Sequence, residues 1–257
     1  MISATLPESF KEKQCNDLLR IGSKNDGGYV ISRSSILNTE ILVSLGIDNN
    51  WSFEKHFLKI NSVPCYAFDH SIGAIIFFKN FIKNLVRIDK PKLIFRNLKI
   101  YFSYLSFFRS KNIHVKKFVG DVLSKNYISL SEILSNFKTQ KIFLKVDIEG
   151  DEYRLLDDIL KNNNNFSGLI IEFHNCDLNI KKIENFLKSF NLDIINLHAN
   201  NYTSINKKTK IPLSIEISFG KTKENKEKLN LASQNLNFPN NPSDEDIEIN
   251  FINEDSI

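Results

Sequence analysis

The stretch that most constrains this chain is residues 141–156, KIFLKVDIEGDEYRLL. It opens with an apolar run, continues into acids and a glycine, and ends with apolar residues at helical spacing. A β-branched and aromatic run that is closed by a glycine and followed by a helix is typical of a buried strand leading into a βα turn. Because ligands of open α/β sheets bind beyond the carboxyl ends of the strands, we expect Asp147 and Glu149 at an active site.

The remaining apolar runs predict a doubly wound α/β fold. Runs that are typical of strands occur at residues 40–46, 63–68, 113–119, 142–146, 168–174, 194–197 and 212–219. Helical patterns separate most of them, which indicates a mostly parallel sheet whose last two strands form an antiparallel hairpin. Residues 5–20 are predicted to form a short helix.

The bulk composition fits one large domain followed by a tail. The 257 residues are 42% hydrophobic and 25% charged, enough for a substantial core. We place the folded domain at residues 1–220 and expect the charged, Asn-rich residues 221–257 to form a loosely packed polar tail. The net charge of +4 is too small to indicate nucleic acid, and no nucleic-acid partner is expected.

The cysteines and the N-terminus indicate a cytoplasmic protein. Cys15, Cys65 and Cys176 are odd in number and widely spaced, which suits neither a disulfide framework nor zinc binding. The first residues carry no apolar signal segment, and the chain has no apolar stretch of spanning length.

Two glycine turns are candidates for cofactor binding. The turn at residues 25–28, NDGG, predicts either a plain hairpin or a place where backbone approaches a cofactor, which makes Asp26 and Gly27 candidate contacts. SLGIDNN follows the first strand and supplies Gly46 and Asp48. The chain has neither GxGxxG nor a P-loop, so a cofactor without a pyrophosphate is favoured.

Acids and histidines follow the later strands. Asp69 ends the second strand, where it either binds a ribose diol or caps a helix. The fifth strand ends in Glu172, His174 and Asn175, and the next one runs into His198.

Residues 72–112 interrupt the α/β rhythm with interleaved basic and aromatic side chains. Pro91 divides this insertion into two amphipathic helices. Two alternatives remain open: the aromatic residues pack on the sheet, or the insertion is a cap that recruits an anionic or lipid-linked substrate or touches a membrane surface. The second alternative would place the protein at the inner face of the membrane.

Three of these features together, SLGIDNN, FDHS and VDIEGDE, resemble S-adenosylmethionine-dependent methyltransferases with the Rossmann-like class I fold. VDIEGDEYRLL together with RIGSKNDGGYVI, IEFH, HANNY and LNFPNNP is similar to the FkbM-type methyltransferases. The resemblance implies that Gly46 and its neighbours lie under the methionine part of the cofactor. It also implies that Asp69 holds the ribose and that Asp121 approaches the adenine.

The resemblance further implies O-methylation, with a sugar or surface-glycan precursor as the acceptor. An alcohol nucleophile must lose a proton, which His174 or His198 as a base, with Asp147 beside the hydroxyl, would accomplish. A Mg or Mn ion on Asp147, Glu172 and Asn175 is the alternative. Structural roles also remain open: hydrogen bonding for both histidines and helix capping for Glu149. A second hypothesis is a non-catalytic glycan-binding or membrane-binding module on the same fold.

Overall fold

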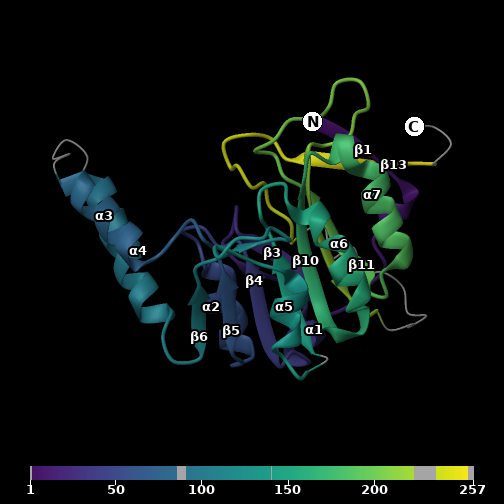
Figure 1. The fold of residues 1–257 in the computed structure, drawn as a ribbon. Helices are drawn as coiled ribbons and strands as arrows, with labels where there is room; N and C mark the ends of the chain where they lie inside the picture. The colour runs from purple at the N-terminus through teal and green to yellow at the C-terminus, as the bar shows by residue number, and fades with distance from the viewer. Residues whose placement is uncertain (1, 86–90, 140, 223–235, 254–257) are drawn as a thin grey trace.

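The computed structural model describes residues 2–85, 91–139, 141–222 and 236–253. Its centre is a seven-stranded sheet, shown in Figure 1. In spatial order its strands are β11 (Asp193–Ala199), β12 (Ser214–Gly220), β10 (Phe166–His174), β9 (Ile142–Val146), β4 (Ile41–Leu45), β5 (Cys65–Phe68) and β6 (Asn112–Val115). Neighbouring strands are parallel from β10 to β6, whereas β12 is antiparallel to both β10 and β11.

This sheet confirms the predicted fold class, a Rossmann-like, doubly wound and mostly parallel α/β arrangement. The chain runs outward from β4 through β5 to β6, returns to the centre at β9, and then runs outward through β10 in the other direction. The direction of winding therefore reverses between β4 and β9. Such a switch point opens a crevice at the carboxyl ends of the strands.

Alternating side chains give the sheet two covered faces. Val43, Leu144 and Ile171 belong to a core shared with three helices, α5 (Leu130–Ser135), α6 (Leu156–Lys161) and α7 (Cys176–Ser189). Leu42, Phe143 and Ile170 face the opposite core, which is closed by α1 (Arg33–Leu37), α2 (Ser52–Ile60) and the hairpin of β2 (Leu18–Gly22) and β3 (Gly28–Ser32). Short 3-10 turns lie at Glu8–Phe10, Glu152–Arg154 and Asn163–Asn165.

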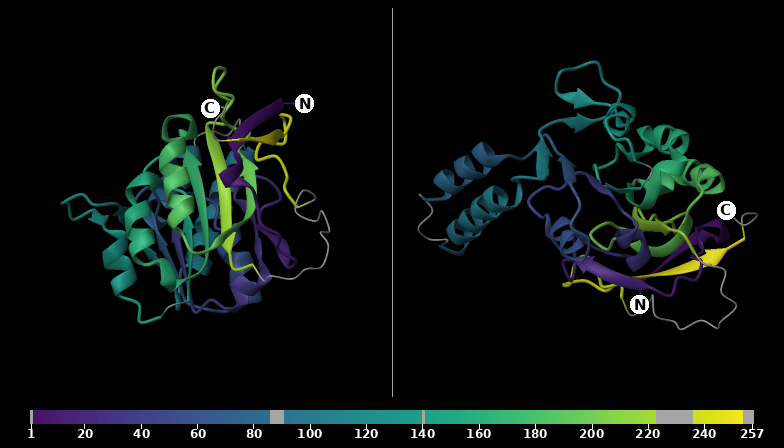
Figure 2. Two further views of the ribbon diagram at one scale, coloured as in Figure 1. Left: turned by 90° about the vertical axis from the view of Figure 1, so that its right-hand side faces the viewer. Right: turned by 90° about the horizontal axis from the view of Figure 1, so that it is seen from below.

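The N-terminal prediction was wrong. Residues 5–20 do not form a helix, because β1 (Ile2–Pro7) pairs in parallel with β13 (Ile247–Ile252), as Figure 2 shows. Leu18 and Leu19 belong to β2 and pair with β3. Both pairings are made with partners outside the segment, so local periodicity does not reveal them.

The predicted tail is also structured in its described part. β13 lies beside β1, and Ile247 is buried in the main core. Asn25 Nδ2 donates to the Pro239 carbonyl at 2.7 Å, which fixes residues preceding β13 against the β2–β3 turn. Residues 236–253 are therefore packed against the domain. The expectation for residues 223–235 lies outside the described residues.

The predicted third strand, residues 113–119, is divided in two. β6 leaves the sheet after Val115, where the Lys117 amide donates back to the Val115 carbonyl at 2.8 Å. The chain then forms β7 (Phe118–Val119), which pairs with β8 (Tyr127–Ile128) away from the main sheet. Consecutive lysines, Lys116 and Lys117, occupy the turn.

The insertion forms two helices, as predicted, and Pro91 begins the second. α3 (Ala74–Leu85) and α4 (Pro91–Phe107) pack against each other and extend away from the sheet (Figures 1 and 2). Only Phe77 and Phe107 are buried within them. The aromatic residues therefore do not lie on the sheet as a stripe, since contact with the domain is confined to the base of this α3–α4 hairpin.

Candidate functional site

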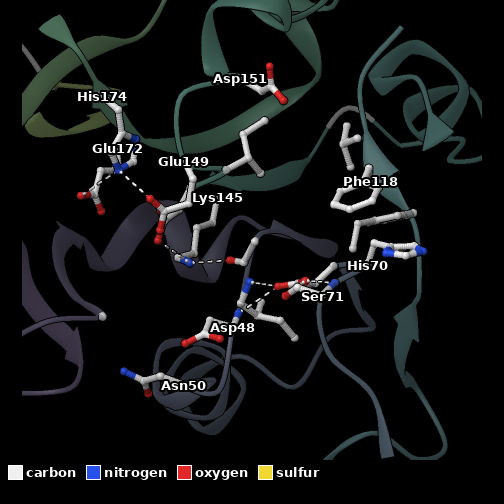
Figure 3. Close-up of a pocket in the computed structure, with 18 of the residues that line it drawn as sticks. Asp48, Asn50, His70, Ser71, Phe118, Lys145, Glu149, Asp151, Glu172 and His174 are labelled. Atoms are coloured by element: carbon white, nitrogen blue, oxygen red, sulfur yellow. Dashed lines mark hydrogen bonds and ion pairs between the residues drawn. The ribbon is translucent and has the colours of Figure 1, made fainter. Parts of the chain in front are cut away.

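A pocket of about 570 Å³ lies at the switch point between β4 and β9 (Figure 3). The segments that follow β4, β5, β9 and β10 line it, together with the tip of the β2–β3 hairpin. Nine predicted site residues line this pocket: Asp26, Gly27, Gly46, Asp48, Asp69, Asp147, Glu149, Glu172 and His174. Three others, Asp121, Asn175 and His198, are not among its lining residues.

Gly46 allows the segments after β4 and β9 to pass each other. Its φ is +75°, and a Cβ atom there would lie 1.7 Å from the Asp147 carbonyl oxygen. The Asp147 amide donates to the Leu45 carbonyl at 2.9 Å, which holds the two strand exits together. A side chain at position 46 would separate the two strand exits, so the packing of the strands requires a glycine here whether or not a ligand binds.

Asp69 supports the loop after β4. Its Oδ2 accepts from the amides of Ile47 at 3.0 Å and Asp48 at 2.9 Å. Its Oδ1 accepts from the Ser71 amide at 2.8 Å and the Ser71 hydroxyl at 2.6 Å. Burial would raise the pKa of Asp69, but these hydrogen bonds lower it below the ordinary value. Asp69 thus fixes one wall of the pocket and leaves little acceptor capacity for a ribose diol.

A buried lysine that the apolar pattern concealed lies beneath this wall. Lys145, in β9, is 4% exposed, and its Nζ donates to the Gly46 carbonyl at 2.9 Å. Nζ also lies 3.6 Å from Asp147 Oδ2, which accepts from the Tyr29 hydroxyl at 3.2 Å. Burial would lower the pKa of Lys145, but Asp147, Glu54 and Glu172 together raise it. Lys145 therefore carries a positive charge among carboxylates.

Glu172 and His174 form the second polar part of the site. Burial, together with Asp147 and Glu216, raises the pKa of Glu172 well above its ordinary value. Glu172 Oε1 accepts from Asn200 Nδ2 at 2.7 Å and lies 3.6 Å from His174 Nε2. His174 Nδ1 lies 3.0 Å from Glu152 Oε1. Burial would lower the pKa of His174, but Glu152, Glu172 and Asp147 raise it to about 9. A histidine with this pKa is protonated at neutral pH, which suits a hydrogen-bond donor better than a general base.

The acid that caps the VDIEGDE turn is Glu152. Its Oε1 accepts from the amides of Ile148 at 3.2 Å and Gly150 at 3.0 Å, and its side chain is fully buried. Glu149 has a left-handed backbone with φ of 56° and a side chain that is 87% exposed. The capping role considered for Glu149 thus belongs to Glu152. The Glu149 carboxylate lies at the pocket, 3.6 Å from His174 Nε2.

The structure groups a different set of metal-ligand residue types from the predicted one. One ligand atom each from Asp147, Glu149 and His174 lies within 4.8 Å of the others. In the predicted set, Glu172 Oε1 is already engaged by Asn200 and Ser214, and Asn175 lies outside the pocket lining. The oxygen-rich donors suit Mg or Mn, but His174 would first have to lose its proton.

The opposite end of the pocket is aromatic. The rings of His70 and Phe118 are stacked, with centroids 4.3 Å apart and an angle of 21° between them. Figure 3 shows this pair across the pocket from Glu149, Glu172 and His174. Asp121, which was expected near an adenine, is exposed beyond β7 because the chain has turned away from the sheet by that point. Phe118 and His70 are instead the candidates for contact with an adenine at this end of the pocket.

His198 belongs to a separate cluster. Its Nε2 lies 3.0 Å from Asp246 Oδ1, and its Nδ1 lies 3.5 Å from Glu216 Oε2. Burial would lower the pKa of His198, but Asp246 and Glu216 raise it to about 9. His198 lies outside the lining of the switch-point pocket, and it is paired with the segment before β13. The structure therefore supports a hydrogen-bonding role for this histidine. The predicted role as a catalytic base is disfavoured.

Comparisons with known proteins found distant structural likeness and no match in sequence. No protein-family model and no curated protein matches this sequence. Among solved structures, an rRNA methylase from Streptococcus thermophilus has a TM-score of 0.38 at 11% identity, covering 74% of this chain and 94% of that chain. The Methanococcus jannaschii fibrillarin pre-rRNA processing protein has a TM-score of 0.36 at 11% identity, covering 83% and 85% respectively. Likeness at this level carries no argument about activity, which rests on the site itself.

Proposed function

We propose that this protein is an S-adenosylmethionine-dependent methyltransferase that methylates a hydroxyl group of a sugar or surface-glycan precursor. The observation that carries the proposal is the pocket at the switch point, which is acidic at one end and aromatic at the other. The acceptor class rests on the resemblance of VDIEGDE and HANNY to the FkbM-type enzymes.

The residues at the two ends of the pocket fit the parts of this cofactor. The acidic part of the pocket is lined by four carboxylates and therefore suits a cationic group. These carboxylates belong to Asp26, Asp48, Asp147 and Glu149. The stacked rings of His70 and Phe118 offer an apolar face for a base. The volume of about 570 Å³ lies in the usual range for small-molecule sites. When bound there, the cofactor would supply an activated methyl group on a sulfonium.

The chain's own contribution is to orient and deprotonate the acceptor. Asp147 faces the pocket and is held by the Tyr29 hydroxyl and the Lys145 ammonium, so its carboxylate has a fixed position. We assign it the role of accepting the proton of the hydroxyl. Protonated His174 would orient the acceptor oxygen by donating from Nε2. A Mg or Mn ion on Asp147, Glu149 and His174 would instead make the hydroxyl more acidic.

The test is transfer of an isotopically labelled methyl group from the cofactor to components of a cell extract, followed by mass spectrometry of the product. The Asp147→Asn variant should lose activity by at least about 100-fold, the usual contribution of a positioned base. Asp157→Asn is the control, because Asp157 is exposed on α6. EDTA should abolish turnover if the metal is required, with Mg or Mn restoring it, whereas unchanged turnover in EDTA leaves the carboxylate as the base.

One observation favours the alternative of a non-catalytic binding module. Asp69, which would hold the ribose, already accepts four hydrogen bonds from the loop after β4 and from Ser71. If glycan or membrane binding survives both Asp69→Ala and Asp147→Ala while no methyl transfer occurs, the alternative is correct. Detection of a methylated product that depends on Asp147 would exclude it.

A further inference from the structure

The α3–α4 hairpin exposes large apolar side chains that the fold leaves without cover. On α4, Phe95 is 70% exposed and Phe102 is 59% exposed. Because these residues are seven apart, they lie on one face of the helix. On α3, Ile75 is 72% exposed, and Phe78 and Ile82 are each 46% exposed. Several large exposed apolar side chains on two packed helices are typical of an interaction site, whereas single scattered ones are ordinary surface.

Basic residues accompany these apolar side chains. Lys92 and Lys99 are exposed on α4 and alternate with Phe95 and Phe102 at spacings of three or four residues, so they share that face. Arg96 is also exposed and lies four residues after Lys92 and three before Lys99. Lys79 and Lys83 are exposed on α3 and lie next to Phe78 and Ile82 along the chain. Within the residues that form α3 and α4 the sequence has no acid. The hairpin therefore presents positive charge together with apolar surface.

The base of the hairpin is firmly attached to the domain. The Trp51 ring packs against Phe77 and Tyr104, with centroids 6.0 Å and 5.9 Å away. Lys55 Nζ donates to the Ser103 hydroxyl at 2.6 Å. These contacts use the inner faces of the two helices. The outer side chains, such as Phe95 and Phe102, are therefore not needed to hold the hairpin in place.

We propose that the outer face of the α3–α4 hairpin binds the surface of an anionic lipid bilayer. Apolar side chains would enter the interfacial region, and the lysines and arginine would meet the anionic headgroups. Exposed isoleucines favour lipid over RNA, because only planar side chains stack on bases. None of the helices in the described ranges has the length and hydrophobicity needed to cross a bilayer, so the attachment is peripheral.

The attachment would also position the pocket. Trp51 follows Asn50 and Asp48, both of which line the pocket, so the loop that carries the hairpin base also forms a pocket wall. Membrane binding would hold this entrance close to acceptors anchored in the same membrane. The inference does not depend on methyl transfer, since vesicle binding is measured without any cofactor.

The test is co-sedimentation of the full chain with vesicles of phosphatidylcholine alone or with 30% phosphatidylglycerol. Binding should require the anionic lipid and should weaken as salt is raised. Each basic residue near the surface contributes about 1 kcal/mol, so Lys92→Gln/Arg96→Gln/Lys99→Gln should lower partitioning roughly 100-fold. Phe95→Gln/Phe102→Gln should lower it at least about tenfold, because two buried aromatic side chains are lost. Glutamine keeps the helix propensity of these positions.

The matched controls replace exposed apolar and exposed basic residues elsewhere on the surface. Leu37→Gln/Leu178→Gln alters side chains that are 55% and 81% exposed, and Lys181→Gln/Lys207→Gln/Lys208→Gln removes three exposed charges. Both controls should bind vesicles as the unaltered chain does, and circular dichroism should show that all variants remain folded. Equal binding by the hairpin variants overturns the proposal. It is also overturned if the hairpin variants lose RNA binding or self-association while anionic vesicles are never bound.

Discussion

At the scale of single residues, Lys145 is the centre of the charge balance in the site. It occupies a strand position where neighbouring residues are apolar, its Nζ lies 3.6 Å from Asp147 Oδ2, and it also lies in the field of Glu54. Glu54 is completely buried, and burial raises its pKa. Lys145 thus offsets negative charge on both the floor of the pocket and the α2 face of the sheet. Its removal would leave Asp147 with the Tyr29 hydroxyl as its donor and would remove the positive charge that faces both carboxyl groups.

We therefore expect Lys145→Met to lower the free energy of unfolding by about 3–5 kcal/mol, the cost of breaking a buried ion pair from one side. Lys141→Met is the control, because Lys141 forms an exposed pair with Glu40 and should cost less than about 1 kcal/mol. Urea unfolding measures both. Adding Glu54→Gln should recover part of the loss, and a double-mutant coupling below about 0.5 kcal/mol would contradict the account.

His198 makes stability depend on pH. Burial would lower the pKa of His198 below its ordinary value of 6.5, but Asp246 and Glu216 raise it to about 9 in the folded chain. A raised pKa means that the folded state holds the proton more tightly, so its stabilising effect is complete below about pH 6.5 and disappears as pH rises through about 9. Arg20 also lies in the field of Glu216 and Asp246 and stays charged throughout.

The expected result is a fall in the free energy of unfolding between pH 7 and pH 9.5. His174, whose pKa is also raised to about 9, contributes in the same direction. His198→Gln should flatten the pH dependence by about half, since it removes one of the two groups. Denaturant unfolding at several pH values measures this, and an unchanged slope in the variant would show that His198 does not carry the charge described.

At the scale of elements, the segment from residue 236 to β13 is bonded to the β2–β3 turn through Asn25 and Pro239, and to β12 and the loop after β11. Asn240 Nδ2 donates to Glu216 Oε1 at 2.6 Å, and Asn201 Nδ2 donates to the Asn241 carbonyl at 3.0 Å. The strand itself covers β1, whose Ala4 and Leu6 are fully buried. The tip that this segment holds contributes Asp26 and Gly27 to the pocket.

A chain that ends after Lys221 should therefore unfold at a temperature about 2–8 °C lower than the 257-residue chain, or fail to remain soluble. Loss of β13 exposes apolar surface and leaves the Glu216 carboxylate without its donor, and about 1–2 kcal/mol corresponds to several degrees. A chain that ends after Asn253 keeps β13 and is the control. Equal melting temperatures for all three chains would mean that residues 236–253 are a tail, as the sequence predicted.

The sequence predicted the elements whose signals are local, and it missed those that form through contacts between distant segments. Buried parallel strands such as β9 and β10 carry continuous apolar runs and are visible locally. β1 and β13 pair across nearly the whole chain, and neither is apolar enough to stand out. The α3–α4 hairpin was visible as two helices, because its Pro91 and its aromatic spacing are local signals. Its projection away from the sheet depends on Trp51, which no local pattern connects to it.

At the scale of the whole molecule, the topology brings the site together. Asp147 and His174 were predicted because acids and histidines directly follow apolar strands, and parallel strand ends converge at one edge of a sheet. Tyr29 and Asn200 reach the same site from the β2–β3 hairpin and the loop after β11. A lysine within the apolar run KIFLKV was the available signal for Lys145. No comparable signal indicated that His198 is paired away from the pocket, since Asp246 is remote in sequence.

The central claim is that the switch-point pocket binds S-adenosylmethionine, and isothermal titration calorimetry of the full chain tests it most directly. The account predicts saturable one-to-one binding that weakens about tenfold in Phe118→Ala, because a stacked base contributes about 1–3 kcal/mol. Phe102→Ala, on the exposed face of α4, should bind as the unaltered chain does. No binding at millimolar cofactor, or equal affinity in Phe118→Ala, would contradict the assignment of this pocket.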